Sequence, residues 1–489
     1  MTTSISDRLN EAFIPAVNVL EKIIFWDVAK AIGLDLPYEI PFVVIWLIFG
    51  GVFFTVRMRF INISGFRHAI QLVLGKFDRP GEKGEVSHFR ALATALSATV
   101  GLGNIAGVAI AIAVGGPGAT FWMIMAGFLG MSLKFSECTL GLKYRRISDK
   151  GIVSGGPMYY LEEGLRKRKL KYLGLLLAAL YAILIILASF GGGNMLQSNQ
   201  AYAQLCQVAP FFIGKGIWVG LILAFLVGLV IIGGLKSIAR VTARIVPFMA
   251  ILYVVTSLTI IGINYDRILE VFWLIVREAF NMHAAKGGFL GVMIMGFRRG
   301  AFSNEAGIGS ASIAHAAAKT NIPVREGLVA LLEPFIDTVI ICTMTALVII
   351  FTGVYETHPH LNGAPLTSAA FATVYNWYPY LLVVAIFLFA FSTMISWSYY
   401  GLNGFVFLSS GFWKNTKIPT LIYQVLFLFF VVLGSATNLT DVITFSDMMI
   451  LGLAFPNLMG LLILTKEIKQ DLNSYLKQIK EYTTDYART

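Results

Sequence analysis

Long apolar windows dominate the pattern of hydrophobic and polar positions along this chain of 489 residues. A helix needs about 20 apolar residues to cross about 30 Å of hydrocarbon, and eleven windows approach or exceed that length. They are residues 40–56, 91–115, 119–142, 172–205, 216–233, 245–263, 287–310, 326–352, 380–409, 418–433 and 442–465. The pattern therefore predicts an all-α polytopic membrane protein with about 11 transmembrane helices.

Two further segments are amphipathic rather than continuously apolar. Residues 267–281 read RILEVFWLIVREAFN and mix charged and apolar positions at helical spacing, which favours a helix lying in the membrane interface over one that crosses it. Residues 1–39 have a similar character, and they lack the basic start and apolar core of a cleaved signal. We therefore expect an amphipathic N-terminal segment at 1–39 and an interfacial segment at 264–286.

The composition excludes a soluble protein. Hydrophobic residues make up 57% of the chain and charged residues 13%, against about 45–50% and about 25% in ordinary globular domains. A soluble fold of this size has too little interior to cover so much apolar surface, so lipid must cover the rest.

The positive charge fits the membrane orientation better than nucleic-acid binding. The chain has 38 Lys and Arg residues against 27 Asp and Glu, a net charge of +11. With the N-terminus outside, the inner segments hold about four times as many cations as the outer ones, and residues 353–379 hold none. We therefore expect a periplasmic N-terminal segment, a cytoplasmic tail at 466–489 and no nucleic-acid partner.

After an extra transmembrane helix at 40–58, ten windows form two blocks of five, at 91–263 and 287–465. An odd number of crossings per block inverts the second relative to the first. The opening windows of the two blocks contain ALSATVGLGNIAGVAIAIAVGG and GVMIMGFRRGAFSNEAGIGSA, each with glycines beside polar residues at mid-depth. Such interruptions at corresponding places point to broken helices that build a binding site, although small residues also allow close helix packing.

The third window of each block carries an unusual number of polar groups. The first contains ASFGGGNMLQSNQAY and the second contains FAFSTMISWSYYGLNG. Polar groups this deep are costly unless they face a cavity or one another. Asn194 and Gln197 could also act as interhelical hydrogen-bond partners, and Trp397 as a packing residue or interfacial anchor.

Several segments together resemble a known transporter family. They are ATVGLGNIAGVAIAIAVGGPGATFW, SGGPMYYLEEGL, FGGGNMLQSNQ, RGAFSNEAGIGSASIAHAAAKT and SWSYYG, at residues 98–122, 154–165, 190–200, 299–320 and 396–401. The chain resembles the alanine or glycine:cation symporter family, which includes the sodium:alanine symporters. The resemblance implies a fold like that of the bacterial leucine transporter, a 5+5 inverted repeat with broken first and sixth core helices. It also implies sodium-coupled uptake of alanine or glycine, with Na+ as coupling ion and no other cofactor.

The resemblance also implies site residues. In the substrate site, the break at Leu102 and Gly103 together with Met295 and Gly296 would receive the carboxylate and backbone, Gln197 would bind the ammonium group, and Thr393 and Trp397 would close the opposite wall. The implied sodium ligands are the backbone near Ala98 and Gly101 with the hydroxyls of Ser392 and Thr393, and Thr99 and Asn104 are further candidates. The family commonly has threonine where this chain has Leu102, which would narrow the pocket or change its preference.

The second interruption contains two arginines, Arg298 and Arg299, where many family members have a small residue at the first position. They could cap the inner half-helix or form a structural network with an acidic partner. The functional alternative is an inner gate built from such a pair. The candidate partners are Glu305, Glu333 and Asp337.

Other reactive side chains suggest no enzyme. Lys134 and Glu137 are three apart on one helix and predict an intrahelical pair, while His315 reads as a packing or interface histidine rather than a proton relay. Cys138, Cys206 and Cys342 are far apart and predict buried thiols. The six histidines have no metal-ligand spacing, no G-x-x-x-x-G-K-S/T stretch exists, and no nucleophile–base pair can be recognised.

The sequence therefore predicts a secondary active transporter of the cell inner membrane. It would import a small neutral amino acid with sodium by alternating access. A proton-coupled or exchange carrier for another amino acid is the rival within the transporter class, although the first broken helix lacks an Asp or Glu at the membrane centre. A channel or an amino-acid-sensing membrane receptor is the alternative from another class.

Overall fold

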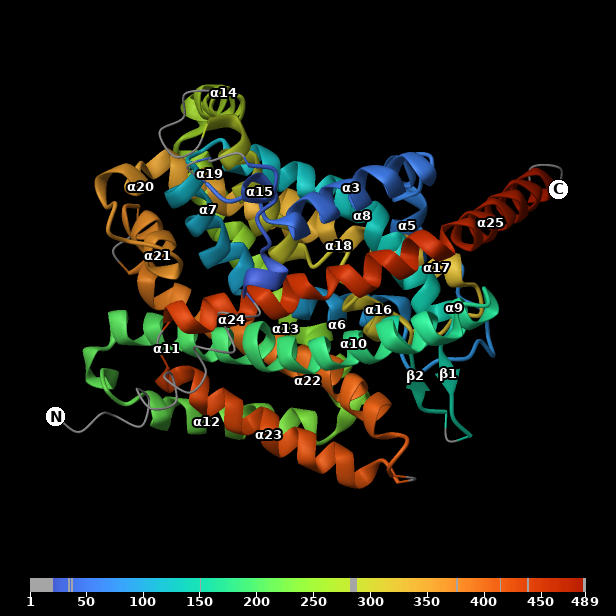
Figure 1. Cartoon of the computed structure of the whole chain (residues 1–489). Helices are drawn as coiled ribbons and strands as arrows, with labels where there is room; N and C mark the ends of the chain where they lie inside the picture. The colour runs from blue at the N-terminus through green and yellow to red at the C-terminus, as the bar shows by residue number, and fades with distance from the viewer. Residues whose placement is uncertain are drawn as a thin grey trace.

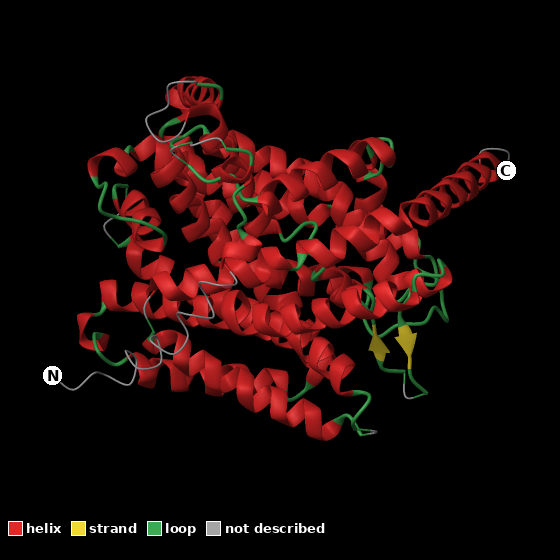
Figure 2. Cartoon of the chain, in the orientation of Figure 1, coloured by secondary structure: helices red, strands yellow, loops and turns green. Residues whose placement is uncertain are grey.

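The computed structural model describes residues 21–33, 36, 38–149, 151–281, 288–374, 377–413, 415–437 and 439–486. Almost all of this part of the chain is helical (Figure 2). The expected amphipathic segment at 1–39 lies mostly outside the described residues, as does the end of the segment at 264–286.

The first half of the chain forms helices and one small hairpin. In chain order these are α2 (Val28–Ala31), α3 (Phe42–Arg57), α4 (Ile61–Ser64), α5 (Phe66–Val73), α6 (His88–Thr99), η1 (Gly103–Gly107), α7 (Val108–Gly115), α8 (Ala119–Lys143), β1 (Arg146–Ile147), β2 (Val153–Ser154), α9 (Pro157–Lys167), α10 (Lys171–Phe190), η2 (Gly191–Met195), α11 (Leu196–Val208), η3 (Pro210–Phe212), α12 (Gly216–Ile231) and α13 (Gly234–Ile263). Strands β1 and β2 pair antiparallel, with Arg146 opposite Ser154.

The described part of the second half consists of helices joined by short loops. It consists of η4 (Tyr265–Arg267), α14 (Ile268–Ala279), α15 (Gly288–Asn304), α16 (Ala311–His315), α17 (Pro323–Ala330), α18 (Leu332–Pro334), η5 (Phe335–Cys342), α19 (Thr343–Thr352), α20 (Val354–Thr357), α21 (Ala364–Ala372), α22 (Tyr378–Ser409), α23 (Lys417–Ala436), α24 (Leu439–Gly452) and α25 (Ala454–Tyr486). Segments η1, η2 and η5 are π-helical, and η3 and η4 are 3-10 helices.

Each of the eleven predicted windows falls on a helix or on helices that follow one another. Within the described residues, seven helices are long and apolar enough to cross a membrane, and the bent pair α6–α7 makes an eighth. Helices α3 and α12 are apolar but shorter, and α15 has 17 residues. The protein is therefore a multi-pass helical membrane protein, and the exact number of eleven crossings stays a prediction.

The first interrupted helix lies where the sequence placed it. Helix α6 ends at Thr99, the chain turns at residues 100–102, and η1 and α7 continue at an angle of 51° to α6. Small residues at this point leave the backbone uncovered by side chains, which permits both the turn and a close approach of other segments.

The second interruption lies later than the sequence predicted. Helix α15 runs unbroken through Met295 and Gly296 to Asn304, the chain is non-helical at 305–310, and α16 begins at Ala311. The predicted break at Met295 and Gly296 is therefore wrong. A Cβ on Gly296 would lie 2.5 Å from the Ala119 carbonyl oxygen, so this glycine lets α15 pack against α8.

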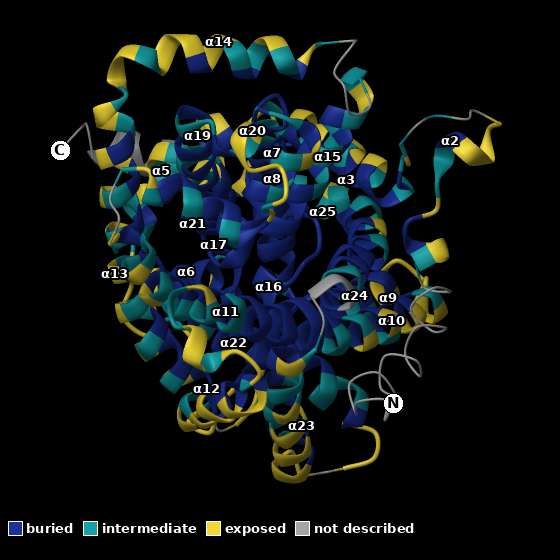
Figure 3. Ribbon diagram, turned by 90° about the vertical axis from the view of Figure 1, so that its left-hand side faces the viewer, coloured by how far each residue is buried: buried dark blue, intermediate teal, exposed yellow. Residues whose placement is uncertain are grey.

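Helix α8 forms the centre of the core and is buried along most of its length (Figures 1 and 3). Glycines on α8 bring other elements close. A Cβ on Gly130 would lie 2.7 Å from the Ala306 Cβ, and one on Gly141 would lie 2.8 Å from the Ser312 Cβ. The second interruption and α16 therefore lie directly against α8.

The hairpin end of the molecule, defined as the end that carries β1 and β2, closes around the chain that follows α16. Val86 forms a parallel bridge with Ala318. Arg145 donates four hydrogen bonds, of 2.6–2.8 Å, to the carbonyl oxygens of Lys83, Ala316, Ala318 and Thr320. The charge distribution predicts that this end is cytoplasmic.

Three parts of the fold lie at the periphery. Helix α14 lies at the opposite end, packs on the bundle through Ala279, whose carbonyl accepts from the Trp122 indole at 3.0 Å, and exposes much of its surface, including Trp273 (Figures 1 and 3). Helices α12 and α23 lie side by side, and the Ser435 hydroxyl donates to the Gly216 carbonyl at 2.9 Å (Figure 1). Helix α25 projects beyond the bundle at the hairpin end (Figure 1).

The contact between α15 and α8 predicts the effect of adding one methyl group. Gly296→Ala places a Cβ against backbone atoms of α8 that cannot move aside, and overpacking of this kind costs about 1–3 kcal/mol. Thermal denaturation in detergent should show a lower Tm. Gly262→Ala in α13 is the control because no atom lies within 4 Å of its Cβ position, and its Tm should be equal or higher.

Candidate functional site

The two interruptions face each other in the middle of the molecule. A Cβ on Gly103 would lie 3.2 Å from the Ser303 Cα, at the end of α15. Asn104 fixes the first turn, because its side-chain oxygen accepts from the Gly101 amide at 2.8 Å and its NH2 group donates to Asp337 Oδ1 at 2.6 Å. The first interruption is thus tied to η5.

The second interruption is held by side chains from several helices. The Asn304 side-chain oxygen accepts from the Ala306 amide at 2.9 Å, and Glu137 Oε2 accepts from the Gly309 amide at 3.1 Å. Asn457 donates to the Gly307 carbonyl and the Tyr181 hydroxyl donates to the Ile308 carbonyl, both at 2.8 Å. Backbone groups freed by the break are therefore satisfied inside the protein, as a membrane interior requires.

Two of the predicted substrate residues, Gln197 and Thr393, meet beside the first turn at Gly101. A Cβ on Gly101 would lie 2.6 Å from the Thr393 hydroxyl oxygen and 3.6 Å from the Gln197 side-chain oxygen. Gln197 follows the π-helix η2 and donates to the Gly192 carbonyl at 2.8 Å. Its side-chain oxygen is buried and accepts no hydrogen bond from the described residues. This oxygen is an acceptor facing the turn.

Trp397 lies deep in the core and links this region to the second interruption. Its indole N–H donates to Glu305 Oε1 at 3.1 Å, and the Ser310 hydroxyl donates to the other Glu305 oxygen at 2.6 Å. Glu305 has a φ of +55°, a left-handed conformation that a non-glycine residue adopts only where its surroundings hold it there. Gly193 passes so close to Trp397 that a Cβ would lie 2.4 Å from its ring.

A cavity of about 70 Å³ lies next to the first interruption. Of the predicted substrate residues it is lined by Leu102 and Gly103, and Gln197 lies about one helical turn before the lining residue Gln200. The other lining residues are Ala106, Gly107, Ile110, Leu196, Arg299, Phe302, Asn362, Gly363, Ile443 and Asp447. The Leu102 side chain is buried and stands beside both the cavity and the turn.

Two predicted substrate residues lie elsewhere. Met295 packs beside Gly115, whose Cβ position is 3.3 Å from the Met295 side chain, and Gly296 packs on α8. Phe302, on the last turn of α15, lines the cavity instead. The polar run SNEAG that follows Phe302 was the signal that marked the true interruption.

The predicted sodium ligands are brought together only in part. Ser97 on α6 donates to the Ser392 carbonyl at 2.6 Å, and the Thr393 hydroxyl donates to the Ser97 carbonyl at 3.1 Å. Ala98 therefore lies next to α22. The Thr99 hydroxyl instead donates back to the Ala95 carbonyl of its own helix at 3.3 Å, and Asn104 is engaged as described above.

Asp337 was predicted as a partner for arginine but lies in another network. Its carboxylate accepts from the Ser303 hydroxyl at 2.9 Å and the Thr338 hydroxyl at 2.7 Å, besides Asn104. A buried carboxylate thus lies between the two interruptions. No spacing pattern pointed to this role, because its partners Asn104 and Ser303 are far away in the sequence.

The arginines of α15 pair with a residue that the sequence analysis did not single out. Arg298 and Arg299 approach Asp447 Oδ2 at 3.0 and 2.5 Å. The predicted pairing with Glu305, Glu333 or Asp337 is therefore wrong. Because Asp447 is on α24, a late helix, only the tertiary fold brings it to α15, where it borders the cavity with Arg299.

Other predicted groups form a second buried cluster near the hairpin end. Lys134 Nζ lies 3.9 Å from Glu137 Oε1 but only 3.2 Å from Glu333 Oε2, so the intrahelical pair is the weaker contact. His315 contacts two carboxylates rather than serving as a packing histidine. The Cys138 sulfur, a ring nitrogen of His315 and a carboxylate oxygen of Glu333 lie within 4.8 Å of one another. Their spacing in the sequence could not indicate this grouping.

The cysteines are free thiols. Cys138 and Cys342 are buried, as predicted, whereas Cys206 is partly exposed.

Comparison with known proteins gives matches along most of the chain. The model of the sodium:alanine symporter family matches residues 28–488. Sodium/alanine symporter AgcS of Methanococcus maripaludis is 39% identical over 89% of this chain and 94% of its own length. The probable sodium/glutamine symporter GlnT of Bacillus subtilis is 36% identical over 91% of this chain and 90% of its own length. Among solved structures, MhsT in complex with L-phenylalanine has a TM-score of 0.47 and 14% identity, covering 79% of this chain and 100% of that one.

Proposed function

The chain belongs to the sodium:alanine symporter family, and from that premise we propose that it imports a small neutral amino acid together with Na+. Its relatives are named as symporters and carriers, in agreement with the prediction that it is not an enzyme. We place it in the cell inner membrane with the hairpin end cytoplasmic. The 5+5 inverted repeat, residues 91–263 and 287–465, is the arrangement we propose for the helices.

The observation that carries this proposal is the meeting of two helix interruptions beside a buried acceptor. The outer half-helix formed by η1 and α7 starts at Gly103, and the first amide groups of a helix favour a carboxylate. The free side-chain oxygen of Gln197 suits an ammonium group. A site with both features fits a zwitterionic amino acid, with Thr393 and Trp397 at its far side.

The cavity supports a small substrate. Its volume of about 70 Å³ is small beside the roughly 300–1,000 Å³ of pockets that hold drug-sized ligands, which favours alanine or glycine over the larger glutamine. Leu102 is the residue we propose to set this limit, because it lines the cavity and directly follows Gly101, beside which the Gln197 oxygen lies.

For Na+ the chain offers neutral oxygens and one nearby carboxylate. Sodium is a hard cation that prefers oxygen ligands, and backbone carbonyls freed at an interruption supply them. We propose a site between α6 and α22, near Ala98, Gly101, Ser392 and Thr393. Asp337 lies close to the same turn and would balance part of the positive charge.

Alternating access requires that each end can close. Arg299 and Asp447 border the cavity, together with Asn362 and Gly363 from a loop that the charge distribution predicts to be outer, and Arg298 also pairs with Asp447. We therefore propose this triad as the outer gate, in place of the inner gate predicted from sequence. Arg145 and its four carbonyl partners close the hairpin end.

Transport itself is the first test. In proteoliposomes, uptake of labelled alanine should rise severalfold with an inward Na+ gradient, because inward Na+ flow drives accumulation. Gln197→Ala should lose most of this uptake by removing the buried acceptor. Uptake that is equal with and without the gradient would contradict sodium coupling, and full uptake by Gln197→Ala would contradict the site.

Leu102→Ala should broaden substrate choice. Removing the side chain joins the cavity to the space beside Gln197, so larger neutral amino acids such as glutamine should compete with labelled alanine more strongly, by about tenfold for a gain near 1.4 kcal/mol. Ile105→Ala is the matched control, because Ile105 is equally buried and does not line the cavity. An unchanged competition panel in Leu102→Ala would refute its role.

Asp447→Asn should weaken the outer gate. Breaking a buried ion pair leaves uncompensated charge and costs about 3–5 kcal/mol, so the outer-closed state should be less populated and uptake should fall at least about tenfold. A cysteine introduced at Ile443, which lines the cavity, should then react faster with an external thiol reagent in a Cys206→Ser background.

The control for this variant is Asp471→Asn. Asp471 pairs with Lys143 at 2.6 Å but is partly exposed, so its loss should change uptake little. Slower labelling at Ile443 in Asp447→Asn than in the parent would exclude an outer gate.

A further inference from the structure

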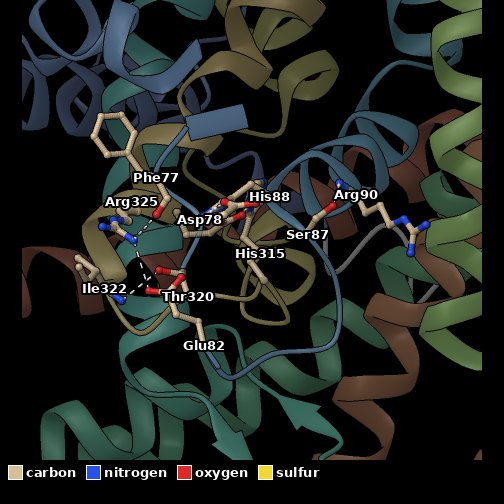
Figure 4. Close-up of polar contacts among 12 residues, drawn as sticks. Phe77, Asp78, Glu82, Ser87, His88, Arg90, His315, Thr320, Ile322 and Arg325 are labelled. Atoms are coloured by element: carbon tan, nitrogen blue, oxygen red, sulfur yellow. Dashed lines mark hydrogen bonds and ion pairs between the residues drawn. The ribbon is translucent and has the colours of Figure 1, made fainter. Parts of the chain in front are cut away.

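A fully buried ionic cluster near the hairpin end has no role in the proposed substrate or sodium sites. It consists of Lys134 on α8, His315 on α16, Glu326 on α17 and Glu333 on α18. His88 on α6 is its neighbour, and all five residues are at most 3% exposed. Figure 4 shows His88 and His315 close together beside Asp78. Groups of this kind are rare and costly inside a membrane protein, which makes a function the default expectation.

The hydrogen bonds of the cluster need one proton more than two neutral histidines supply. His315 Nδ1 lies 2.6 Å from Glu326 Oε1, and His315 Nε2 lies 2.5 Å from Glu333 Oε1. His88 Nδ1 contacts the other Glu326 oxygen. Each of these three nitrogen–oxygen contacts needs a proton, whereas two neutral imidazoles carry two. The third proton is on His315, or on a carboxylate bonded to it.

Charge balance favours the same additional proton. Lys134 Nζ lies 3.2 Å from Glu333 Oε2 and 3.9 Å from Glu137 Oε1, so this cation already faces two carboxylates. Glu326 is paired with His88 and His315, and a proton on these histidines compensates a negative charge that would be strongly unfavourable alone in a dry interior.

A path for the proton leads from the cluster to the hairpin end. His88 Nε2 has no hydrogen-bond partner among the described residues and lies 3.8 Å from the carboxylate of Asp78. The Asp78 side chain is 55% exposed at the hairpin end. A chain of side-chain contacts therefore connects water on that side to the cluster, and it runs through Asp78, His88, Glu326 and His315.

Other titratable groups face the cluster from the surrounding elements. On α17 itself, Arg325 turns away and pairs with Glu82 at 3.3 Å. Further groups with an electrostatic effect on the cluster are Glu137 and Cys138 on α8, Arg145 after it, Glu305 in the second interruption, Asp337 in η5 and Tyr400 on α22. Arg145 adds one positive charge, but the carboxyl groups of Glu137, Glu305 and Asp337 outnumber it, so these groups do not replace the proton.

The position of the histidines gives the proton a mechanical consequence. His315 ends α16, the short helix after the second interruption, and His88 begins α6, the helix before the first. Their shared proton network ties both segments to α17 and α18. Loss of one proton would set a nitrogen lone pair against a carboxylate oxygen and weaken this attachment.

We propose that His315 with Glu326 and Glu333 is a proton-binding site, open to the cytoplasm through His88 and Asp78, that locks the inner half-helices when occupied. The proton enters from and returns to the same side, so none is carried across the membrane. Low cytoplasmic pH holds the inner path closed, and higher pH releases it. The effect on transport rests on the proposed function, whereas the effect on α16 does not.

Hydrogen exchange of the purified chain tests the lock without any substrate. After correction for intrinsic exchange, amides of residues 311–318 should lose protection by at least about threefold between about pH 6 and about pH 9. Glu326→Gln should remove this dependence while keeping the segment protected, because the neutral amide needs no extra proton. His315→Gln should also remove the dependence, with lower protection throughout.

His358→Gln is the matched control. His358 is exposed on the predicted outer loop, so this variant should behave as the parent does. Protection of residues 311–318 that does not change with pH in the parent would overturn the proposal. Retention of the full pH dependence in both Glu326→Gln and His315→Gln would also overturn it.

Transport supplies the second measurement. At fixed external pH and Na+ gradient, alanine uptake into proteoliposomes should rise severalfold with internal pH in the parent and little in Glu326→Gln. An internal pH dye should report no proton movement linked to uptake. Stoichiometric proton movement with uptake would overturn the claim that the proton exchanges with one side only. If uptake is absent while the amides of residues 311–318 keep their pH-dependent protection, the result counts against the proposed function alone.

Discussion

The need to satisfy backbone groups away from water governs this structure. A helix that stops in the middle of a membrane frees amide and carbonyl groups, each costing several kcal/mol if left alone. Asn104 serves the first interruption, while Glu137, Asn457 and Tyr181 serve the second. The partners of the second interruption come from α8, α10 and α25, and Asn104 is itself tied to Asp337 of η5, so the interruptions exist only in the assembled bundle. The same contacts fix where the two interruptions meet and thus where a substrate can bind.

Buried charge imposes the second constraint. Asp447 is shared by two arginines, and Lys134 faces two carboxylates. Unpaired charges at these depths would be far more costly than paired ones, so each pair holds two helices in a defined relation. A change in protonation or a break in a pair moves those helices relative to each other, which is what a transport cycle requires.

The sequence predicted the helical windows, the first interruption and the family. It misplaced the second interruption. A glycine such as Gly296 is typical of a helix break, but here it brings α15 against α8. It assigned the arginines to nearby acidic residues, since separation along the chain was the only available guide. It also read His315 as a packing residue, because the two carboxylates that bind it come from other helices.

The sequence by itself determined that this chain lies in a membrane, which of its segments are basic and which could break, because apolar length, charge and glycine content are properties of local segments. Only the tertiary structure decided which broken backbone group meets which side chain. Hydrogen bonds and ion pairs act over about 3–4 Å. The partners of Gly309, Arg299 and His315 became visible only once distant helices were packed together.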